Sequence, residues 1–150
     1  MNIAAVVIAR GGSKGIPNKN IINFCGKPLI GWTIEQCLAS KNISQIWVSS
    51  DSNEILEIAK KYNINTLRRP DILSDDYASS ESAWLHAINF IEKKNKVDMI
   101  LAPQVTSPLR ETKDFDDAIN SFNKNKFDSM FSANVVEDLL FWQNEDGNAR

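Results

Sequence analysis

Short runs of apolar residues recur along the chain, separated by longer stretches with an apolar residue every three or four positions. The first run, Ile3–Ala9, is apolar at every position, which is typical of a strand buried on both faces of a parallel sheet. Similar runs predict further strands over residues 45–49, 65–67, 97–102 and 129–133.

The stretches between these strands have helical periodicity. Pro28 suits the first turn of a helix that follows Lys27, and Asp51 and Glu54 have the spacing of a capping box that opens a second helix. Two more helices are predicted over residues 82–94 and 113–123. The residues expected to face the core are Leu29, Trp32 and Leu38, then Ile55, Ile58 and Ala59, then Trp84, Leu85, Ile88 and Ile91, and finally Phe115, Ala118, Ile119 and Phe122.

The alternation of strands and helices, without an internal repeat or a linker, predicts an α/β fold with a mostly parallel sheet. Ligands of such sheets bind beyond the carboxyl ends of the strands. The loops expected at that edge are residues 10–20, 49–52, 68–82 and 103–112. These loops are therefore the places to look for chemistry.

Composition narrows the class of protein. A chain of 150 residues is long enough for one domain with its own core. Its 43% hydrophobic and 24% charged residues exclude a disordered or collagen-like chain. The 17 basic and 19 acidic residues give a net charge of −2, which argues against a broad nucleic-acid-binding surface.

Membrane and metal-binding classes also lack support. No apolar run approaches the roughly 20 residues of a membrane span, and Arg10 ends the first run, which has no basic stretch before it as a signal peptide would. Cys25 and Cys37 do not form a Cys-x-x-Cys pair, and the chain has 1 His, so no zinc site is predicted. Two free thiols fit a reducing compartment, and a cytoplasmic protein is expected.

The loop Arg10–Asn20 combines three glycines with three cations and contains no acidic residue. Its glycines, Gly11, Gly12 and Gly15, permit positive φ, which would let backbone N–H groups converge on one anion. Lys14 and Lys19 would add point charges and Arg10 a planar fork, which suit phosphate oxygens. A flexible surface turn is the alternative. The loop matches neither the Walker A pattern nor the dinucleotide-binding fingerprint.

The segment Ala9–Asn20 resembles the signature loop of the acylneuraminate (CMP-sialic acid) cytidylyltransferases. The resemblance continues in Val48–Asp51, in Arg69-Pro70 with Ala78–Ser80, and in Gln104–Arg110, so that four motifs in order cover almost the whole chain. It implies a nucleotide-binding domain over residues 1–150, with a Rossmann-like, mostly parallel sheet and helices on both faces, of nucleotide-diphospho-sugar transferase type. It also implies Mg²⁺-dependent joining of CTP to a nonulosonic acid with release of pyrophosphate.

The resemblance implies roles for particular residues. Arg10 and Lys19 would grip the triphosphate, and Lys19 would follow the charge that moves onto the leaving pyrophosphate. Gln104 would face the sugar–phosphate region as the third catalytic residue. The other nucleotide-binding residues would be Gly11, Gly12, Ser13, Lys14 and Asn20 near the phosphates, and Arg69, Ala78 and Ser80 around cytosine. A solvated Arg69 at a strand end, and helix capping by Ser79, are the structural alternatives.

Several conspicuous residues receive a structural interpretation instead. The capping box explains Asp51, and Asp75-Asp76 is interpreted as a solvated acidic pair. His86 is expected to be packed or exposed within a helix, and Arg110 to pair with Asp114. No residue of the chain is assigned as a metal ligand.

Two other functions compete with this one. The related 3-deoxy-manno-octulosonate cytidylyltransferases typically have Gly-Lys-Pro where this chain has Asn18–Asn20, and an acid in place of Gln104, so the nonulosonate branch is favoured. Within that branch, pseudaminate enzymes tend to carry Arg where Gly15 stands, which favours N-acetylneuraminate or legionaminate as the sugar acid. A truncated, non-catalytic nucleotide-binding fragment is the second alternative.

The last residues carry a separate expectation. Leu139–Trp142 is predicted as a strand and Glu145–Asn148 as a hairpin turn. The family that the chain resembles places two metal-binding aspartates on a later segment and usually dimerises through a C-terminal insertion. The 150 residues are therefore expected to be an incomplete catalytic unit, and the full-length protein is expected to be a homodimer.

Overall fold

The computed structural model describes residues 1–133, 135, 144–145 and 148–149. The elements alternate between strands and helices through most of the chain. In order they are β1 (Ile3–Ile8), the 3-10 turn η1 (Lys19–Ile21), β2 (Asn23–Phe24), β3 (Lys27–Pro28), α1 (Leu29–Ala39), β4 (Gln45–Ser50), α2 (Asn53–Lys60), β5 (Asn65–Arg68), the 3-10 turn η2 (Asp71–Leu73), α3 (Ser80–Ile91), β6 (Met99–Leu101), α4 (Thr112–Asn125), β7 (Asn144–Glu145) and β8 (Asn148–Ala149).

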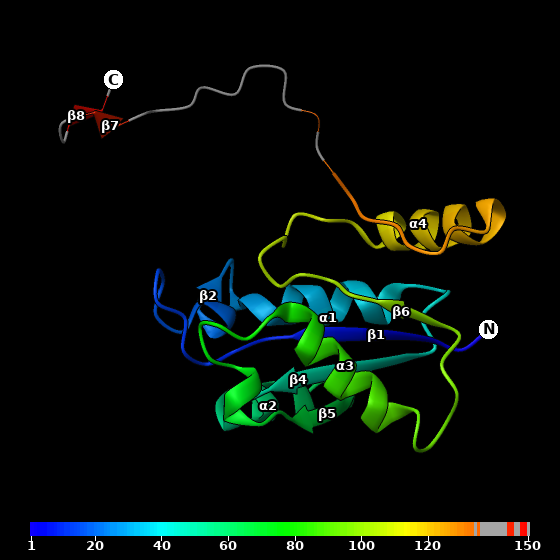
Figure 1. Ribbon diagram of the computed structural model, residues 1–150, viewed down its shortest axis with the longest axis horizontal. Helices are drawn as coiled ribbons and strands as arrows, with labels where there is room; N and C mark the ends of the chain where they lie inside the picture. Colours follow the sequence, from blue (N-terminus) through cyan, green and yellow to red (C-terminus); the bar gives the residue numbers. More distant parts are fainter. Residues whose placement is uncertain (134, 136–143, 146–147, 150) are drawn as a thin grey trace.

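The main sheet has the strand order β5-β4-β1-β6, and its strands pair in parallel. Successive residues of β1 serve opposite faces: Val7 packs in a cluster with Ile30 of α1 and Ile55 of α2, whereas Val6 packs with Ala87 of α3. Helix α3 thus covers one face of the sheet, and α1 and α2 cover the other (Figure 1). The predicted α/β fold with helices on both faces is confirmed.

Two predicted core positions are wrong. Leu38 of α1 is 50% exposed and Leu85 of α3 is 58% exposed. Helix α3 instead turns a stripe of small side chains with Ala83 and Ala87 toward the sheet. Both helices carry apolar residues around most of their circumference, so the sequence period did not single out the buried face.

The predicted fifth strand, residues 129–133, does not form, because no described strand pairs with this segment, and Phe131 is exposed. Near the end of the chain, β7 pairs antiparallel with β8, which confirms the predicted hairpin through the pairing of Glu145 with Asn148. The strand predicted over 139–142 lies outside the described residues.

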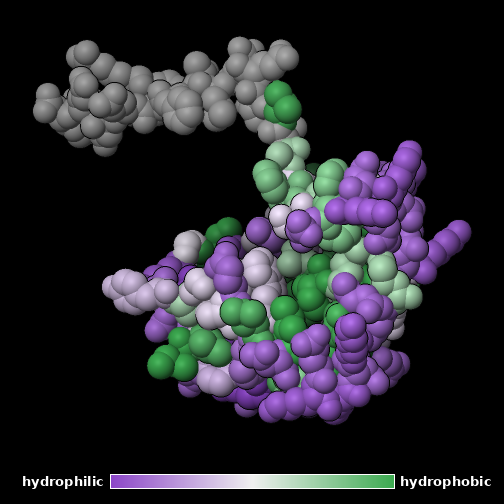
Figure 2. All heavy atoms as spheres, turned by 45° about the vertical axis from the view of Figure 1, so that its right-hand side comes forward, coloured by the Kyte–Doolittle hydropathy of each residue, from purple (hydrophilic) through white to green (hydrophobic). Residues whose placement is uncertain are grey.

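Among the described strands, β6 lies at one edge of the main sheet, and its three residues are half-buried. On the side of the molecule seen in Figure 2, apolar side chains collect in a hollow framed by hydrophilic ones.

Within the described residues, none of the helices has the length and apolar character needed to cross a membrane.

The two cysteines are expected to differ strongly in reactivity. Cys37 is a buried residue of α1, and this burial raises the pKa of its thiol to about 12, with the charge of Arg110 opposing the rise. Cys25 is free and exposed. Because the thiolate is the reactive form, iodoacetamide should alkylate Cys25 in the folded protein and leave Cys37 unmodified, as read by mass spectrometry. In denaturant both should react, and equal rates in the folded protein would contradict the described burial.

Candidate functional site

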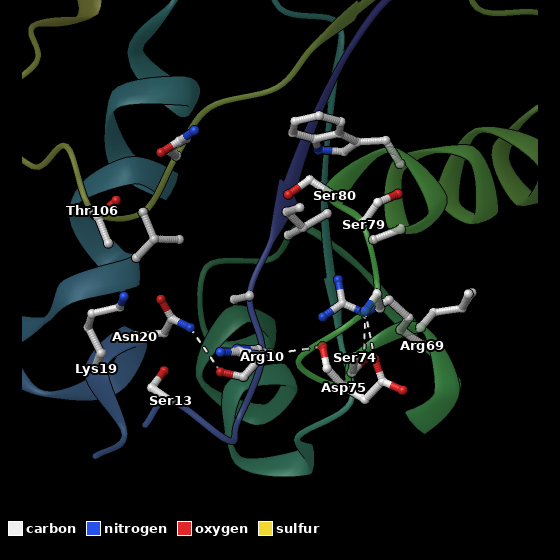
Figure 3. A pocket seen from close by; sticks show the side chains of 18 of the residues that line it. Arg10, Ser13, Lys19, Asn20, Arg69, Ser74, Asp75, Ser79, Ser80 and Thr106 are labelled. Atoms are coloured by element: carbon white, nitrogen blue, oxygen red, sulfur yellow. Dashed lines mark hydrogen bonds between the residues drawn. The ribbon is translucent and has the colours of Figure 1, made fainter. Parts of the chain in front are cut away.

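A cleft of about 380 Å³ lies beyond the carboxyl ends of β1, β5 and β6. Three of the four loops expected there line it, namely those that follow these strands. The lining residues are Ile8, Ala9, Arg10, Ser13, Lys14, Gly15, Lys19, Asn20, Arg69, Leu73, Ser74, Asp75, Ala78, Ser79, Ser80, Ala83, Trp84, Pro103, Gln104, Val105 and Thr106. Lys19, Asn20 and Thr106 lie across the cleft from Arg69, Ser79 and Ser80 (Figure 3).

The loop after β1 forms the cationic wall of the cleft. The buried Asn20 donates from its Nδ2 to the backbone oxygen of Arg10 at 2.9 Å, which ties the far end of the loop to its beginning. Asn18 has a left-handed φ of 53° and opens the turn η1, which carries Lys19. This wall therefore presents Arg10, Lys14 and Lys19 from one short segment.

The role predicted for the glycines of this loop is wrong in its geometry. Positive φ falls on Asn18 and not on Gly11, Gly12 or Gly15. The N–H of Gly11 donates to Oδ1 of Asp51 at 3.1 Å, so it is not aimed at an anion in the cleft. Neither Gly11 nor Gly12 lines the cleft. The carboxylate of Asp51 thus engages the N–H of Gly11, which the sequence suggested was available to bind an anion.

Arg69 is buried on the opposite wall, which excludes the solvated alternative. Its N–H donates to the backbone oxygen of Ser50 at 2.8 Å, and its Nε donates to Oγ of Ser74 at 2.7 Å. Its Nη2 lies 3.8 Å from Oδ1 of Asp51. Burial lowers the pKa of Arg69, and the Asp51 carboxylate opposes this effect. The guanidinium is therefore held in a fixed orientation at the edge of the cleft.

The turn that precedes α3 brings backbone and hydroxyl groups to the same wall. Asp75 accepts from the N–H groups of Tyr77 and Ala78 at 2.9 and 2.6 Å. Ser79 caps α3 by accepting from the N–H of Ser82, so the capping interpretation of Ser79 is confirmed, although Ser79 also lines the cleft. Ser80 begins the helix and lines the cleft beside it.

Asp76 is exposed, as the sequence suggested, but it also forms ion pairs that the sequence did not predict. Its carboxylate pairs with Nη1 of Arg10 at 3.0 Å and with Nζ of Lys14, and so connects the two walls. The hydrogen bond from Lys14, together with the charges of Lys14 and Arg10, lowers the pKa of Asp76. Arg10 lies 66 positions away from Asp76 in the sequence. A local sequence pattern therefore could not reveal this pairing.

The loop after β6 supplies Gln104 and Thr106 to the cleft. Arg110 does not pair with Asp114 as predicted. Its guanidinium donates to Oε1 of Gln36 at 3.2 Å and to the backbone oxygen of Gln104 at 3.5 Å, and Asp114 instead accepts from the N–H of Glu111 as part of a capping box. Arg110 therefore steadies the loop from outside the cleft.

Two other structural interpretations can be checked. The predicted capping role of Asp51 is wrong, because Ser52 is the N-cap of α2 and accepts from the N–H of Ile55 at 3.4 Å. Asp51 turns the other way, toward Gly11 and Arg69. His86 is half-buried on α3 and does not line the cleft.

The described residues do not build a metal site by themselves. No group of three or more His, Cys, Asp or Glu side chains in the described part of the chain is close enough to hold an ion. Asp76 already faces two cations, and Asp75 closes a backbone turn. The two carboxylates beside the cleft are therefore engaged in contacts within the protein.

Comparison with known proteins identifies the family. The cytidylyltransferase family model matches residues 4–141, which is most of the chain, and the chain therefore belongs to the cytidylyltransferase family. Pseudaminic acid cytidylyltransferase of Campylobacter jejuni subsp. jejuni serotype O:23/36 (strain 81-176) is 39% identical over 97% of this chain. N-acylneuraminate cytidylyltransferase A of Danio rerio is 39% identical over 87% of it.

The chain spans 65% of the length of the first of these relatives and 30% of the second. Among solved structures, CMP:2-keto-3-deoxy-manno-octonic acid synthetase complexed with CTP has a TM-score of 0.72 at 18% identity, covering 84% of this chain and 49% of that one. A cytidylyltransferase from Leptospira borgpetersenii serovar Hardjo-bovis has a TM-score of 0.68 at 24% identity, covering 84% and 50%. These likenesses confirm the Rossmann-like fold.

Proposed function

We propose that the protein takes part in transferring CMP from CTP to a nonulosonic acid, with release of pyrophosphate. The observation that carries this proposal is the arrangement of the cleft, in which a cationic loop and a buried arginine face each other. The relatives named for pseudaminic acid and N-acylneuraminate support the class of sugar acid. Both relatives are 39% identical to this chain, so sequence identity does not distinguish their sugar acids. The preference for N-acetylneuraminate or legionaminate therefore rests on Gly15 alone.

The chemistry of the transfer matches the charges around the cleft. A hydroxyl oxygen of the sugar acid loses its proton to solvent and forms a bond to the α-phosphorus of CTP, while the bond from that phosphorus to the pyrophosphate oxygen breaks. Negative charge then accumulates on the leaving pyrophosphate, which positioned cations stabilise. Arg10 and Lys19 are proposed to hold the triphosphate, and Gln104 to contact the sugar–phosphate region. Ser13, Lys14 and Asn20 are proposed to complete the phosphate end.

The base end of the nucleotide is proposed to lie against Arg69, Ala78 and Ser80, which offer a guanidinium, a backbone group and a hydroxyl on one wall. Mg²⁺ is proposed to accompany CTP, as the family resemblance implies. The proposal also includes a cytoplasmic location, which the two free cysteines fit.

Competitive binding to the 150-residue chain tests the base assignment. CTP should bind more tightly than UTP and ATP by about tenfold or more, equivalent to roughly 1.4 kcal/mol. Isothermal titration calorimetry with each nucleotide measures this. Equal affinities for the three nucleotides would remove the base assignment and leave only a phosphate-binding loop.

Replacing Asp76 should strengthen nucleotide binding. Its carboxylate pairs with Arg10 and Lys14, two of the cations at the proposed phosphate end, so Asp76→Asn should lower the dissociation constant of CTP severalfold and leave that of cytidine unchanged. Asp71→Asn is the matched control, because Asp71 belongs to the same loop but pairs with Arg68 outside the cleft. An Asp76→Asn variant that binds CTP less tightly would show that the carboxylate supports binding and does not compete with it.

A further inference from the structure

Asp51 lies between the two walls of the cleft without lining it. It directly follows β4, at the carboxyl edge of the sheet beside the strand β1 that leads into the cationic loop. Its side chain is 20% exposed, and one oxygen, Oδ1, accepts from the N–H of Gly11 at 3.1 Å and lies 3.8 Å from Nη2 of Arg69. A single carboxylate thus contacts the start of one wall and the main cation of the other.

The contact with Gly11 is close. A Cβ atom at position 11 would lie 3.0 Å from Cβ of Ser52 and 3.7 Å from Oδ2 of Asp51, whereas a Cβ at Gly12 would meet nothing within 4 Å. The cationic loop therefore begins pressed against the turn that carries Asp51. Small changes in that turn should move the start of the loop.

The contact with Arg69 compensates a buried charge. The Arg69 side chain is only 4% exposed, and a guanidinium removed from water needs an anion or several acceptors. In the described part of the chain, Asp51 is the carboxylate that pairs with Arg69, and Ser74 accepts from its Nε at 2.7 Å. These two side chains together fix the direction of the guanidinium.

We propose that Asp51 is a positioning residue for nucleobase selection, which holds Arg69 toward the cleft and sets its distance from the phosphate-binding loop. Asp51 does so without touching the nucleotide. The inference rests on the proposed function, in which Arg69 contacts the base. It predicts that loss of the Asp51 charge impairs the choice between bases more than the binding of phosphates.

The test uses Asp51→Asn in the 150-residue chain. The amide oxygen can still accept from the N–H of Gly11, but the charge facing Arg69 is gone. The dissociation constants of CTP, UTP and inorganic tripolyphosphate are measured by calorimetry. We expect the preference for CTP over UTP to fall by about tenfold, and the affinity for tripolyphosphate to change by less than about twofold.

Two further variants separate positioning from general damage. Asp116→Asn is the matched control, because Asp116 accepts from Oγ of Ser40 at 2.6 Å and from Nδ2 of Asn42 at 3.0 Å and does not line the cleft. It removes an equal charge and should leave the ratio of CTP to UTP affinity unchanged. Ser74→Ala removes the second contact of Arg69 and should lower that ratio, which keeps the test decisive if Asp51→Asn fails to fold.

The outcomes are distinct. An Asp51→Asn chain with the wild-type ratio of affinities, or one that loses tripolyphosphate binding as strongly as CTP binding, overturns the inference. If Asp51→Asn does not fold, an unchanged ratio in Ser74→Ala overturns it. A wild-type chain that does not distinguish CTP from UTP overturns the proposed base contact and the inference together, whereas a wild-type preference that survives in Asp51→Asn overturns the inference alone.

Discussion

Lys19→Ala should reduce the turnover of the full-length enzyme by about 10²–10³-fold, on the scale of a lost oxyanion donor. Lys19 lines the cleft, is half-buried, and forms no ion pair within the part of the chain that the structure describes. Its ammonium group is therefore available to the charge that develops on the leaving pyrophosphate. Release of pyrophosphate from CTP in the presence of a nonulosonic acid measures the effect.

Lys14→Ala is the matched control for this prediction. It removes the same charge from the same loop, but the Lys14 side chain is 77% exposed and already pairs with Asp76. Its loss should lower turnover by no more than about tenfold, since exposed charge pairs contribute little. Normal turnover in Lys19→Ala, or an equal loss in both variants, would contradict the role given to Lys19.

Arg69→Met should abolish the preference for CTP over UTP and also destabilise the fold. The buried Arg69 side chain would lose its hydrogen bond to Ser74 and its contact with Asp51, and a hydrogen bond to a charged group contributes about 1.5–3 kcal/mol. The free energy of unfolding, measured by denaturant titration, should fall by about this amount. The ratio of CTP to UTP affinity, measured on the same variant, should approach one.

The neighbouring Arg68→Met provides the comparison. Arg68 is exposed and donates to Asn53 and Asp71 outside the cleft. Its replacement should change the free energy of unfolding by less than about 0.5 kcal/mol and leave the ratio of nucleotide affinities unchanged. An Arg69→Met chain that still prefers CTP would show that the base is read elsewhere.

The fold was largely predictable from the sequence because the buried strands are locally encoded. The run Ile3–Ala9 announces β1 by composition alone, and Ile46–Val48 does the same for β4. A strand also needs a partner, however, and residues 129–133 have strand-like composition but find none among the described residues. Which face of a helix is buried likewise depends on tertiary packing. The periodicity of apolar residues does not encode this packing, as the exposed Leu38 shows.

The sequence allowed the cations of the candidate site to be predicted, but not the contacts of its carboxylates. Arg10, Lys14 and Lys19 stand out because they belong to one glycine-containing loop that directly follows a buried strand. Asp51 and Asp76 act across the fold, on partners 40 and 66 positions away, and each has a plausible local explanation as a cap or a solvated acid. In the structure, both carboxylates form long-range contacts that these local explanations do not include. The sequence therefore located the loops of the cleft but not the contacts that connect them.

The most direct test of the central claim is the formation of CMP-sugar by the full-length protein. The protein is incubated with CTP, Mg²⁺ and one of three sugar acids, N-acetylneuraminate, legionaminate or pseudaminate. The products are separated and identified by mass spectrometry. A parallel series contains UTP in place of CTP. We predict a CMP-sugar from at least one of the three acids, with equimolar pyrophosphate, and no corresponding product from UTP. No CMP-sugar from any of the acids, or equal yields from UTP and CTP, would contradict the proposed function.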